Sequence, residues 1–305
     1  MSSERPVFGG VEAGGTKFVC GIGSGPDDLE TVQFPTTTPM AAIARCIEFF
    51  REAARSPIAA IGIASFGPVD LRPDSPSWGH ITTTPKAGWG NTDLAGPIGE
   101  ALGVPVAFDT DVNAAALAEH RWGAARDVND CVYLTVGTGI GGGAICGGRL
   151  IHGLLHPEMG HMRIPHDPAT DPFPGNCPFH GDCLEGLASG PAIQARWGCR
   201  ADELPREHRA WELEARYLAL AVSNLACTIS PARVILGGGV MAQRHLFDLI
   251  HQHTLALLNG YLESERITAQ IDRYVVPPGL GNRAGVLGAL ALSEAALEAG
   301  RGDGN

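Results

Sequence analysis

The sequence has few charged residues and no run of basic ones. Charged residues make up 18% of the 305 positions, and 22 Lys and Arg stand against 33 Asp and Glu, a formal net charge of −11. Because nucleic acids and anionic membranes are bound through clustered positive charge, this balance argues against both kinds of partner. A hydrophobic fraction of 44% still allows a substantial core, which excludes a disordered chain.

We expect neither a targeting segment nor a linker in this sequence. The charge-free stretch Cys131–Gly148 is interrupted by many glycines, so we do not expect it to span a bilayer. The N-terminal residues lack a basic flank followed by an apolar core, so no secretory signal is expected. No Ser/Gly-rich or charged segment divides the chain, which favours two lobes in close contact. We therefore predict a cytoplasmic protein.

The patterning predicts an α/β fold. Val7–Gly23 reads as two strands around a glycine-rich tip, and Cys131–Cys146 repeats that arrangement. A helical pattern over 39–55 precedes a buried strand at 58–65, and 210–228 has the period of a long helix. The two similar hairpins indicate a weak internal duplication of an α/β half.

Three glycine-rich turns are candidate phosphate sites, because backbone N–H groups in such turns bind anions without side-chain bulk. They are Gly14-Gly15-Thr16-Lys17, Gly137-Thr138-Gly139-Ile140-Gly141 and Gly237-Gly238-Gly239. The alternative for any single turn is a hairpin glycine with positive φ. None has the spacing of a P-loop or of a dinucleotide-binding turn between a strand and a helix.

The sequence contains eight cysteines, and six of them read as small hydrophobic residues. Cys177-x-x-His180-x-x-Cys183 instead has the ligand types and tight spacing of a zinc site, with His161 as fourth ligand and His166 as its alternative. Four protein ligands leave no open position, so the Zn²⁺ would be structural and a zinc hydrolase is disfavoured. The competing interpretation is two buried thiols beside uninvolved histidines.

Several motifs together resemble the ROK sugar kinases, and within them the bacterial fructokinases. The resemblance rests on Glu12-Ala-Gly-Gly-Thr-Lys17, Asp109-Thr-Asp-Val-Asn113, Gly137-Thr-Gly-Ile-Gly141, Glu158-Met-Gly-His161, the 177–185 cysteine segment and Leu236-Gly-Gly-Gly-Val240. These motifs occur in order over nearly the whole chain. The resemblance implies a two-lobed, actin-like ATPase (ribonuclease H-like) fold with a zinc-binding loop insert, in which ATP and a hexose meet in a cleft.

The resemblance also implies a division of the chain and a catalytic base. The smaller N-terminal lobe would be 1–115 plus 284–305, and the larger C-terminal lobe 116–283, with the zinc-binding segment at 156–185. Asp111 matches the family's general base, which takes the proton of the attacking hydroxyl. Asp109 is its rival, and an N-cap role for Asp111 is the structural alternative.

Further site residues follow from the same resemblance. The hexose contacts would come from Lys86, Thr110, Asn113, Glu158, His161 and Glu185. The nucleotide contacts would come from Gly14, Gly15, Thr16, Lys17, Thr138, Gly139, Pro191, Gly237, Gly238, Gly239 and Val240. Glu12 stands where most relatives have Asp, and would orient a water or Mg²⁺. The Mg²⁺ itself would be held chiefly by the phosphates.

The resulting hypothesis is an ATP-dependent hexose kinase that converts D-fructose to fructose 6-phosphate. Glucose, mannose or N-acylmannosamine kinases of the same family are alternatives, because specificity depends on a few hydrogen bonds. A second class is a non-catalytic sugar-sensing protein, but family repressors carry an added N-terminal helix-turn-helix, and the first hairpin here begins at Val7. The resemblance suggests a homodimer.

Overall fold

The computed structural model describes residues 6–302, without the side chains of Ala296 and of 298–302. The described chain divides into two compact units. The first takes its residues from Met1–Trp122, Ile151–His156 and Asn282–Asn305, and the second consists of Gly123–Leu150 and Pro157–Gly281. A crossing segment, 151–156, therefore returns from the second unit to the first.

The first unit is built on a five-stranded sheet in the order β3-β2-β1-β4-β7. Its strands are β1 (Val7–Ala13), β2 (Lys17–Gly23), β3 (Glu30–Pro35), β4 (Ile58–Ser65) and β7 (Val106–Thr110). β1 pairs antiparallel with β2 and parallel with β4, and β7 pairs parallel with β4. β5 (His80–Ile81) and β6 (Thr92–Asp93) form a separate two-stranded antiparallel ribbon.

The second unit repeats this topology. Its sheet has the order β10-β9-β8-β11-β12, and β8 pairs antiparallel with β9 and parallel with β11. The strands are β8 (Cys131–Val136), β9 (Ile140–Cys146), β10 (Arg149–Leu150), β11 (Arg233–Gly237) and β12 (Val275–Val276). In each sheet the first two strands form the glycine-tipped hairpin, so the internal duplication predicted from the sequence is confirmed.

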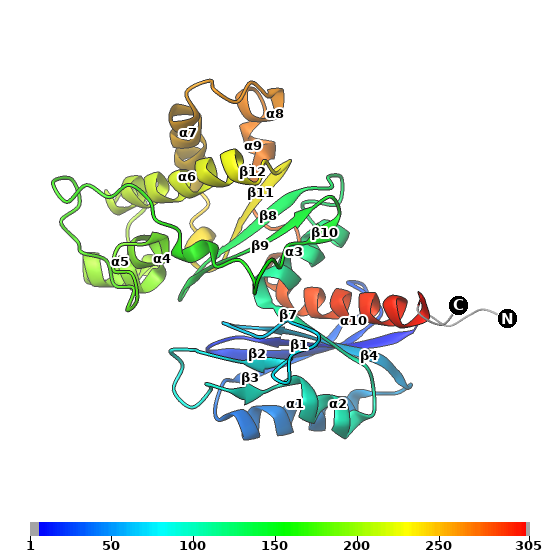
Figure 1. Cartoon of the computed structure of the whole chain (residues 1–305). Helices are drawn as coiled ribbons and strands as arrows, with labels where there is room; N and C mark the ends of the chain where they lie inside the picture. Colours follow the sequence, from blue (N-terminus) through cyan, green and yellow to red (C-terminus); the bar gives the residue numbers. More distant parts are fainter. Residues whose placement is uncertain (1–5, 303–305) are drawn as a thin grey trace. The chain divides into compact units, whose positions relative to one another are not determined.

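Helices cover both faces of the first sheet. α1 (Pro39–Ala53) and α2 (Ala95–Leu102) lie on one face, and α10 (Ala284–Gly302) lies on the other and packs on α3 (Asp111–Trp122) (Figure 1). A Cβ on Gly62 of β4 would lie 1.8 Å from the carbonyl oxygen of Ala289 in α10. Only glycine permits this close approach of helix and strand.

The remaining helices belong to the second unit, and α6 is the longest of them. They are α4 (Leu184–Ala188), α5 (Gly190–Trp197), α6 (Ala210–Thr228), α7 (Leu246–Leu258), α8 (Glu265–Thr268) and α9 (Ile271–Tyr274). Single 3₁₀ turns occur at η1 (Met159–His161), η2 (Ala201–Glu203) and η3 (Val240–Ala242), and η4 (Gly281–Arg283) leads into α10. α6 packs against both α4 and α7.

The predicted α/β class, both hairpins, β4 and α6 agree with the structure. After the third glycine turn the chain forms the 3₁₀ turn η3, and α7 begins at Leu246. The lobe boundary placed at residue 115 falls inside α3. Within residues 6–302, no helix combines the length and apolar character needed to cross a membrane.

Candidate functional site

Two histidines and two cysteines of the second unit converge on one point. The ligand atoms of His161, Cys177, His180 and Cys183 lie within 4.8 Å of one another. Nδ1 of His161 lies 3.7 Å from Sγ of Cys177 and 3.6 Å from Sγ of Cys183, and Nδ1 of His180 lies 3.6 Å from Sγ of Cys177. Tetrahedral zinc requires S···N separations of about 3.5 Å. The four side chains therefore fit zinc.

Local backbone geometry explains why these side chains meet. Cys177 and Gly181 exchange backbone hydrogen bonds of 3.1 and 2.9 Å, which close a tight knuckle around His180. Gly181 has φ of +65°, a conformation that favours glycine. Cys183 is the N-cap of α4, and His161 ends the 3₁₀ turn η1.

The thiols are deeply placed. Cys183 is fully buried, and burial raises the pKa of its thiol to about 11. A bound cation would favour the thiolate and displace its proton. His166 lies outside the cluster: its Nε2 donates to the carbonyl oxygen of Asp171 at 2.9 Å, and its Nδ1 lies 3.3 Å from Oδ2 of Asp182.

In the first unit, Asp111 lies where β7 ends and α3 begins. Thr110 caps this helix, because its Oγ1 accepts from the backbone N–H of Asn113 at 3.1 Å. Asp111 is the first residue of α3 and is half-buried, and its Oδ1 accepts from the N–H of Val112 at 2.9 Å. The positive end of the helix dipole favours a charged carboxylate at this position.

Asp109 is buried, and both of its carboxylate oxygens have hydrogen-bond partners. Its Oδ1 accepts from the backbone N–H of Thr110 at 2.7 Å and from Nδ2 of Asn113 at 2.9 Å, and its Oδ2 lies 2.6 Å from Nε2 of His152. This hydrogen bond raises the pKa of His152. His152 was not singled out from the sequence, since a contact across 43 residues leaves no local pattern.

The other residues predicted to contact the hexose differ in how many of their hydrogen-bonding groups are already used within the protein. Asn113 uses its Nδ2 group on Asp109 and on the carbonyl of Ile151 at 3.2 Å, and its buried Oδ1 has no hydrogen-bond partner within the described chain. Lys86 is half-buried on a loop whose neighbour Trp89 is fully buried and donates from Nε1 to Thr37. Trp89 therefore anchors that loop in the core.

The first glycine turn forms an exposed tip. Gly14 N–H donates to the carbonyl of Lys17 at 3.0 Å, and Thr36 Oγ1 donates to the carbonyl of Gly14 at 2.7 Å. Gly15, Thr16 and Lys17 are exposed. The tip is thus rigid at its base and open at its end, as a ligand-binding turn requires.

Glu12, just before this turn, has a structural role. Burial raises the pKa of its carboxyl group, and the backbone N–H of Val286 donates to it. A Cβ on Gly285 would lie 2.3 Å from Cδ of Glu12. The carboxylate therefore caps the N-terminus of α10, where the helix dipole favours negative charge.

The second and third glycine turns lie together in the second unit. A Cβ on Gly137 would be 3.9 Å from the backbone nitrogen of Gly239, and a Cβ on Gly190 would be 3.9 Å from the side chain of Val240. Gly238 has φ of +91° and packs against the end of β8. The structure thus gathers the turns 137–141 and 237–240, together with Gly190, the residue before Pro191.

Glu185 lies beside the second turn. Its Oε2 accepts from the backbone N–H of Ile140 at 2.9 Å, and Gly190 N–H donates to the carbonyl of Gly137 at 2.8 Å. Glu158, in contrast, is exposed and precedes the 3₁₀ turn that carries His161. Both carboxylates belong to the unit that holds the metal cluster.

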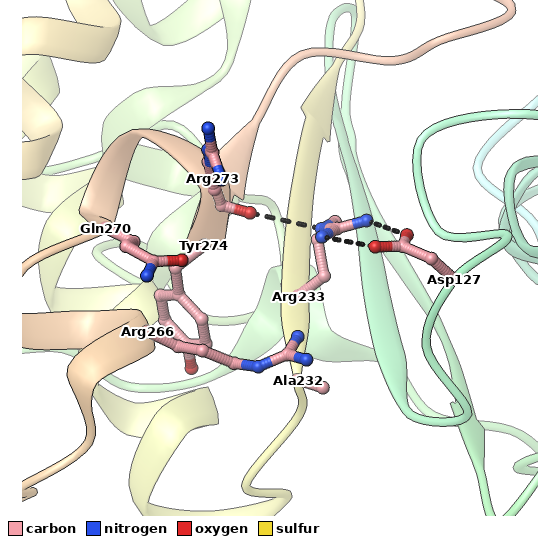
Figure 2. Close-up of a pocket in the computed structure, with 7 residues that line it drawn as sticks. All are labelled: Asp127, Ala232, Arg233, Arg266, Gln270, Arg273 and Tyr274. Carbon is pink, nitrogen blue, oxygen red and sulfur yellow. Dashed lines mark hydrogen bonds and ion pairs between the residues drawn. The ribbon is translucent and has the colours of Figure 1, made fainter.

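A separate pocket of about 240 Å³ lies at the start of β11 and contains none of the predicted site residues (Figure 2). Arg233 donates to both carboxylate oxygens of Asp127, and its Nε donates to the carbonyl of Arg273 at 3.1 Å. Figure 2 shows the side chain of Arg273 turned away from this clamp. Arg233 therefore fixes the first residue of β11.

Comparisons with known proteins agree on one family. A model described as ROK family matches residues 8–296. A fructokinase of Zymomonas mobilis is 46% identical to this chain, over 97% of it and 99% of the relative. A fructokinase of Pediococcus pentosaceus is 43% identical, over 96% and 99%.

Solved structures agree with this result. A ROK hexokinase from Thermus thermophilus has a TM-score of 0.79 at 29% identity and covers 96% of this chain and 99% of its own. A ROK family glucokinase from Streptomyces griseus, in complex with glucose and AMPPNP, has a TM-score of 0.73 at 25% identity, with 95% and 99% covered. The similarity extends over both units.

The pair of His152 and Asp109 predicts a pH-dependent contribution to stability. Because the pKa of His152 is raised in the folded state, the contribution is complete below the unfolded value of about 6.5 and is lost as the pH rises through the folded value. The pair is partly exposed, so we expect His152→Gln to melt only about 1–2 °C below the wild type at pH 5.5.

The gap between the two melting temperatures should narrow at pH 9. His120→Gln, a substitution on α3 away from Asp109, is the control. The difference between its melting temperature and that of the wild type should not narrow between pH 5.5 and pH 9. A His152→Gln gap that widened with rising pH would contradict the assignment.

Proposed function

The chain belongs to the ROK family, and from this we propose that it is an ATP-dependent hexose kinase that phosphorylates D-fructose to fructose 6-phosphate. The observation that carries the proposal is the similarity to fructokinases over nearly the whole length of both proteins. The gathered glycine turns of the second unit support it, since a kinase must hold phosphates through backbone N–H groups.

Asp111 is the general base in this proposal. It accepts the proton of the attacking hydroxyl of fructose while that oxygen bonds to the γ-phosphorus and ADP leaves. Its half-buried place at the start of α3 supports the assignment, and the three hydrogen bonds of Asp109 argue against the rival. Asp109 instead holds the turn that presents Asp111.

The hexose would be bound by Lys86, Thr110, Asn113, Glu158, His161 and Glu185. Carboxylates accept from sugar hydroxyls, and Nε2 of His161 is directed away from the metal cluster because Nδ1 faces the thiols. Thr110 and Asn113 already use part of their hydrogen-bonding capacity within the turn. The buried Oδ1 of Asn113 has no partner within the described chain and would accept from a sugar hydroxyl.

The nucleotide phosphates would be bound by the turns 14–17 and 137–141, with Thr138 and Gly139 at the second tip. The adenosine would lie against Gly237–Val240 and Pro191. Gly239 and Gly190, the residue before Pro191, lie close to Gly137. Mg²⁺ would enter with the β- and γ-phosphates and neutralise charge during transfer. Glu12 caps α10, and its buried Oε2, which has no hydrogen-bond partner within the described residues, would orient a water or the Mg²⁺.

His161, Cys177, His180 and Cys183 would hold a structural Zn²⁺. The ion would supply folding energy to the segment from Glu158 to helix α4, which carries Glu185. Its four protein ligands leave no position for a substrate. As the resemblance suggests, we further propose a homodimer that acts in the cytoplasm.

A panel of sugars tests the proposed activity. ADP release with ATP and Mg²⁺ is measured against fructose, glucose, mannose and N-acetylmannosamine at equal low concentrations, and kcat/KM should be highest for fructose. Preference for glucose, mannose or N-acetylmannosamine would replace the substrate but keep the mechanism. Silence with every sugar, in folded protein with its metal bound, would instead favour a sugar-sensing protein.

Replacing the base should separate chemistry from binding. Asp111→Asn removes the proton acceptor but keeps the shape, so kcat should fall about 10²–10⁴-fold while calorimetry still detects fructose binding. Asp74→Asn, at an exposed loop position, is the matched control and should retain activity. A fully active Asp111→Asn enzyme would refute the assignment.

The metal proposal predicts about one zinc per chain by elemental analysis. Cys183→Ser should lose the metal and melt at a lower temperature, because the substitution removes one of the four ligands that hold the 177–183 segment together. Cys227→Ser is the control, since Cys227 is exposed on α6 and outside the cluster. Verified metal-free protein with unchanged melting temperature would exclude a structural metal.

A further inference from the structure

The tip of the second hairpin is held from outside by the helix pair α4 and α5. Ile140 N–H donates to Oε2 of Glu185 at 2.9 Å, and Gly190 N–H donates to the carbonyl of Gly137 at 2.8 Å. These bonds fall on either side of Thr138 and Gly139. The turn proposed to bind phosphates therefore depends on α4 and α5 for its conformation.

The contact with Glu185 is close as well as hydrogen-bonded. A Cβ on Gly139 would lie 2.7 Å from Oε2 of Glu185, so the carboxylate rests directly against the turn. A hydrogen bond from a backbone N–H to a carboxylate is charge-assisted and stronger than one to a neutral acceptor. Glu185 thus restrains both the direction of the Ile140 N–H and the space beside Gly139.

The helix that carries Glu185 is itself fixed by the metal knuckle. Cys183 is the N-cap of α4, and Leu187 N–H donates to its carbonyl at 3.0 Å. A Cβ on Gly186 would lie 1.9 Å from the carbonyl oxygen of Gly181, so helix and knuckle pack backbone to backbone. The position of Glu185 is therefore set by a rigid neighbour on its N-terminal side.

We propose that Glu185 is a positioning residue for the nucleotide: it holds the 137–141 turn in its phosphate-binding conformation and links hexose binding to nucleotide binding. The inference rests on the proposed kinase function. Within the described chain, Oε2 of Glu185 accepts from the N–H of Ile140, and Oε1 can accept from a sugar hydroxyl. A bound hexose would then immobilise the carboxylate that orders the turn.

Such a link is reciprocal. If hexose tightens nucleotide binding through Glu185, nucleotide must tighten hexose binding by the same factor. A Glu185 that only contacted the sugar would show neither effect, and its loss would change fructose binding alone. Nucleotide affinity in the absence of sugar therefore distinguishes a positioning role from a sugar contact.

The test is calorimetric titration of the metal-containing protein with AMPPNP and Mg²⁺, without sugar and with saturating fructose. Glu185→Ala removes the acceptor and should weaken nucleotide binding without sugar about tenfold. Glu185→Gln keeps a neutral acceptor and should show a smaller loss. In both variants fructose should tighten nucleotide binding less than in the wild type.

Glu207→Gln, at an exposed position without a role in the turn, is the matched control and should bind nucleotide as the wild type does. Melting temperature and metal content are measured for every variant. If Glu185→Ala does not fold, the nucleotide affinity of the isosteric Glu185→Gln tests the positioning role. Unchanged nucleotide Kd in folded Glu185→Gln and Glu185→Ala would overturn the inference alone. A wild type that binds no nucleotide would overturn the proposed function itself.

Discussion

Carboxylates that accept from backbone N–H groups fix the turns on which the rest of this structure depends. Asp109 holds the β7–α3 turn through the N–H of Thr110, and Glu185 holds the tip of the second hairpin through Ile140. Glu12 caps α10 through Val286. In each case a charge-assisted hydrogen bond orders a glycine-rich turn or a helix end. The backbone N–H group that donates has no acceptor within a helix or a sheet.

Local patterns were sufficient for much of the fold. Both hairpins were recognised because glycine and threonine interrupt apolar runs, and α6 because its apolar residues keep a helical period. β3 and α2 were missed for opposite reasons. β3 is a mostly exposed edge strand without a continuous apolar face. α2 contains Gly96, Pro97 and Gly99, which lower helix propensity although tertiary packing overrides it.

In the candidate site, too, the residues of short local motifs were predicted from the sequence, whereas their distant contacts were not. The knuckle from Cys177 to Cys183 is local, so spacing alone revealed its ligand types, and Asp111 was recognised from a short motif. The partners that shape those residues were not visible, because His152 reaches Asp109 across 43 residues and Glu185 reaches Ile140 across 45. Such pairs are set by topology and leave no periodic signal. Glu12 is the opposite case: its motif is visible in the sequence, but its capping contact with Val286 is visible only in the structure.

The placement of α10 has a consequence for synthesis of the chain. This helix, near the C-terminus, covers β1 and β4 of the first unit, and Gly62 admits it at backbone contact. A nascent chain emerging from the ribosome therefore exposes one apolar face of the first unit's sheet until α10 has been translated. The second unit ends at Gly281, before α10 begins, so it can fold first. Chaperones that recognise exposed apolar strands would find their target in the earlier-made half.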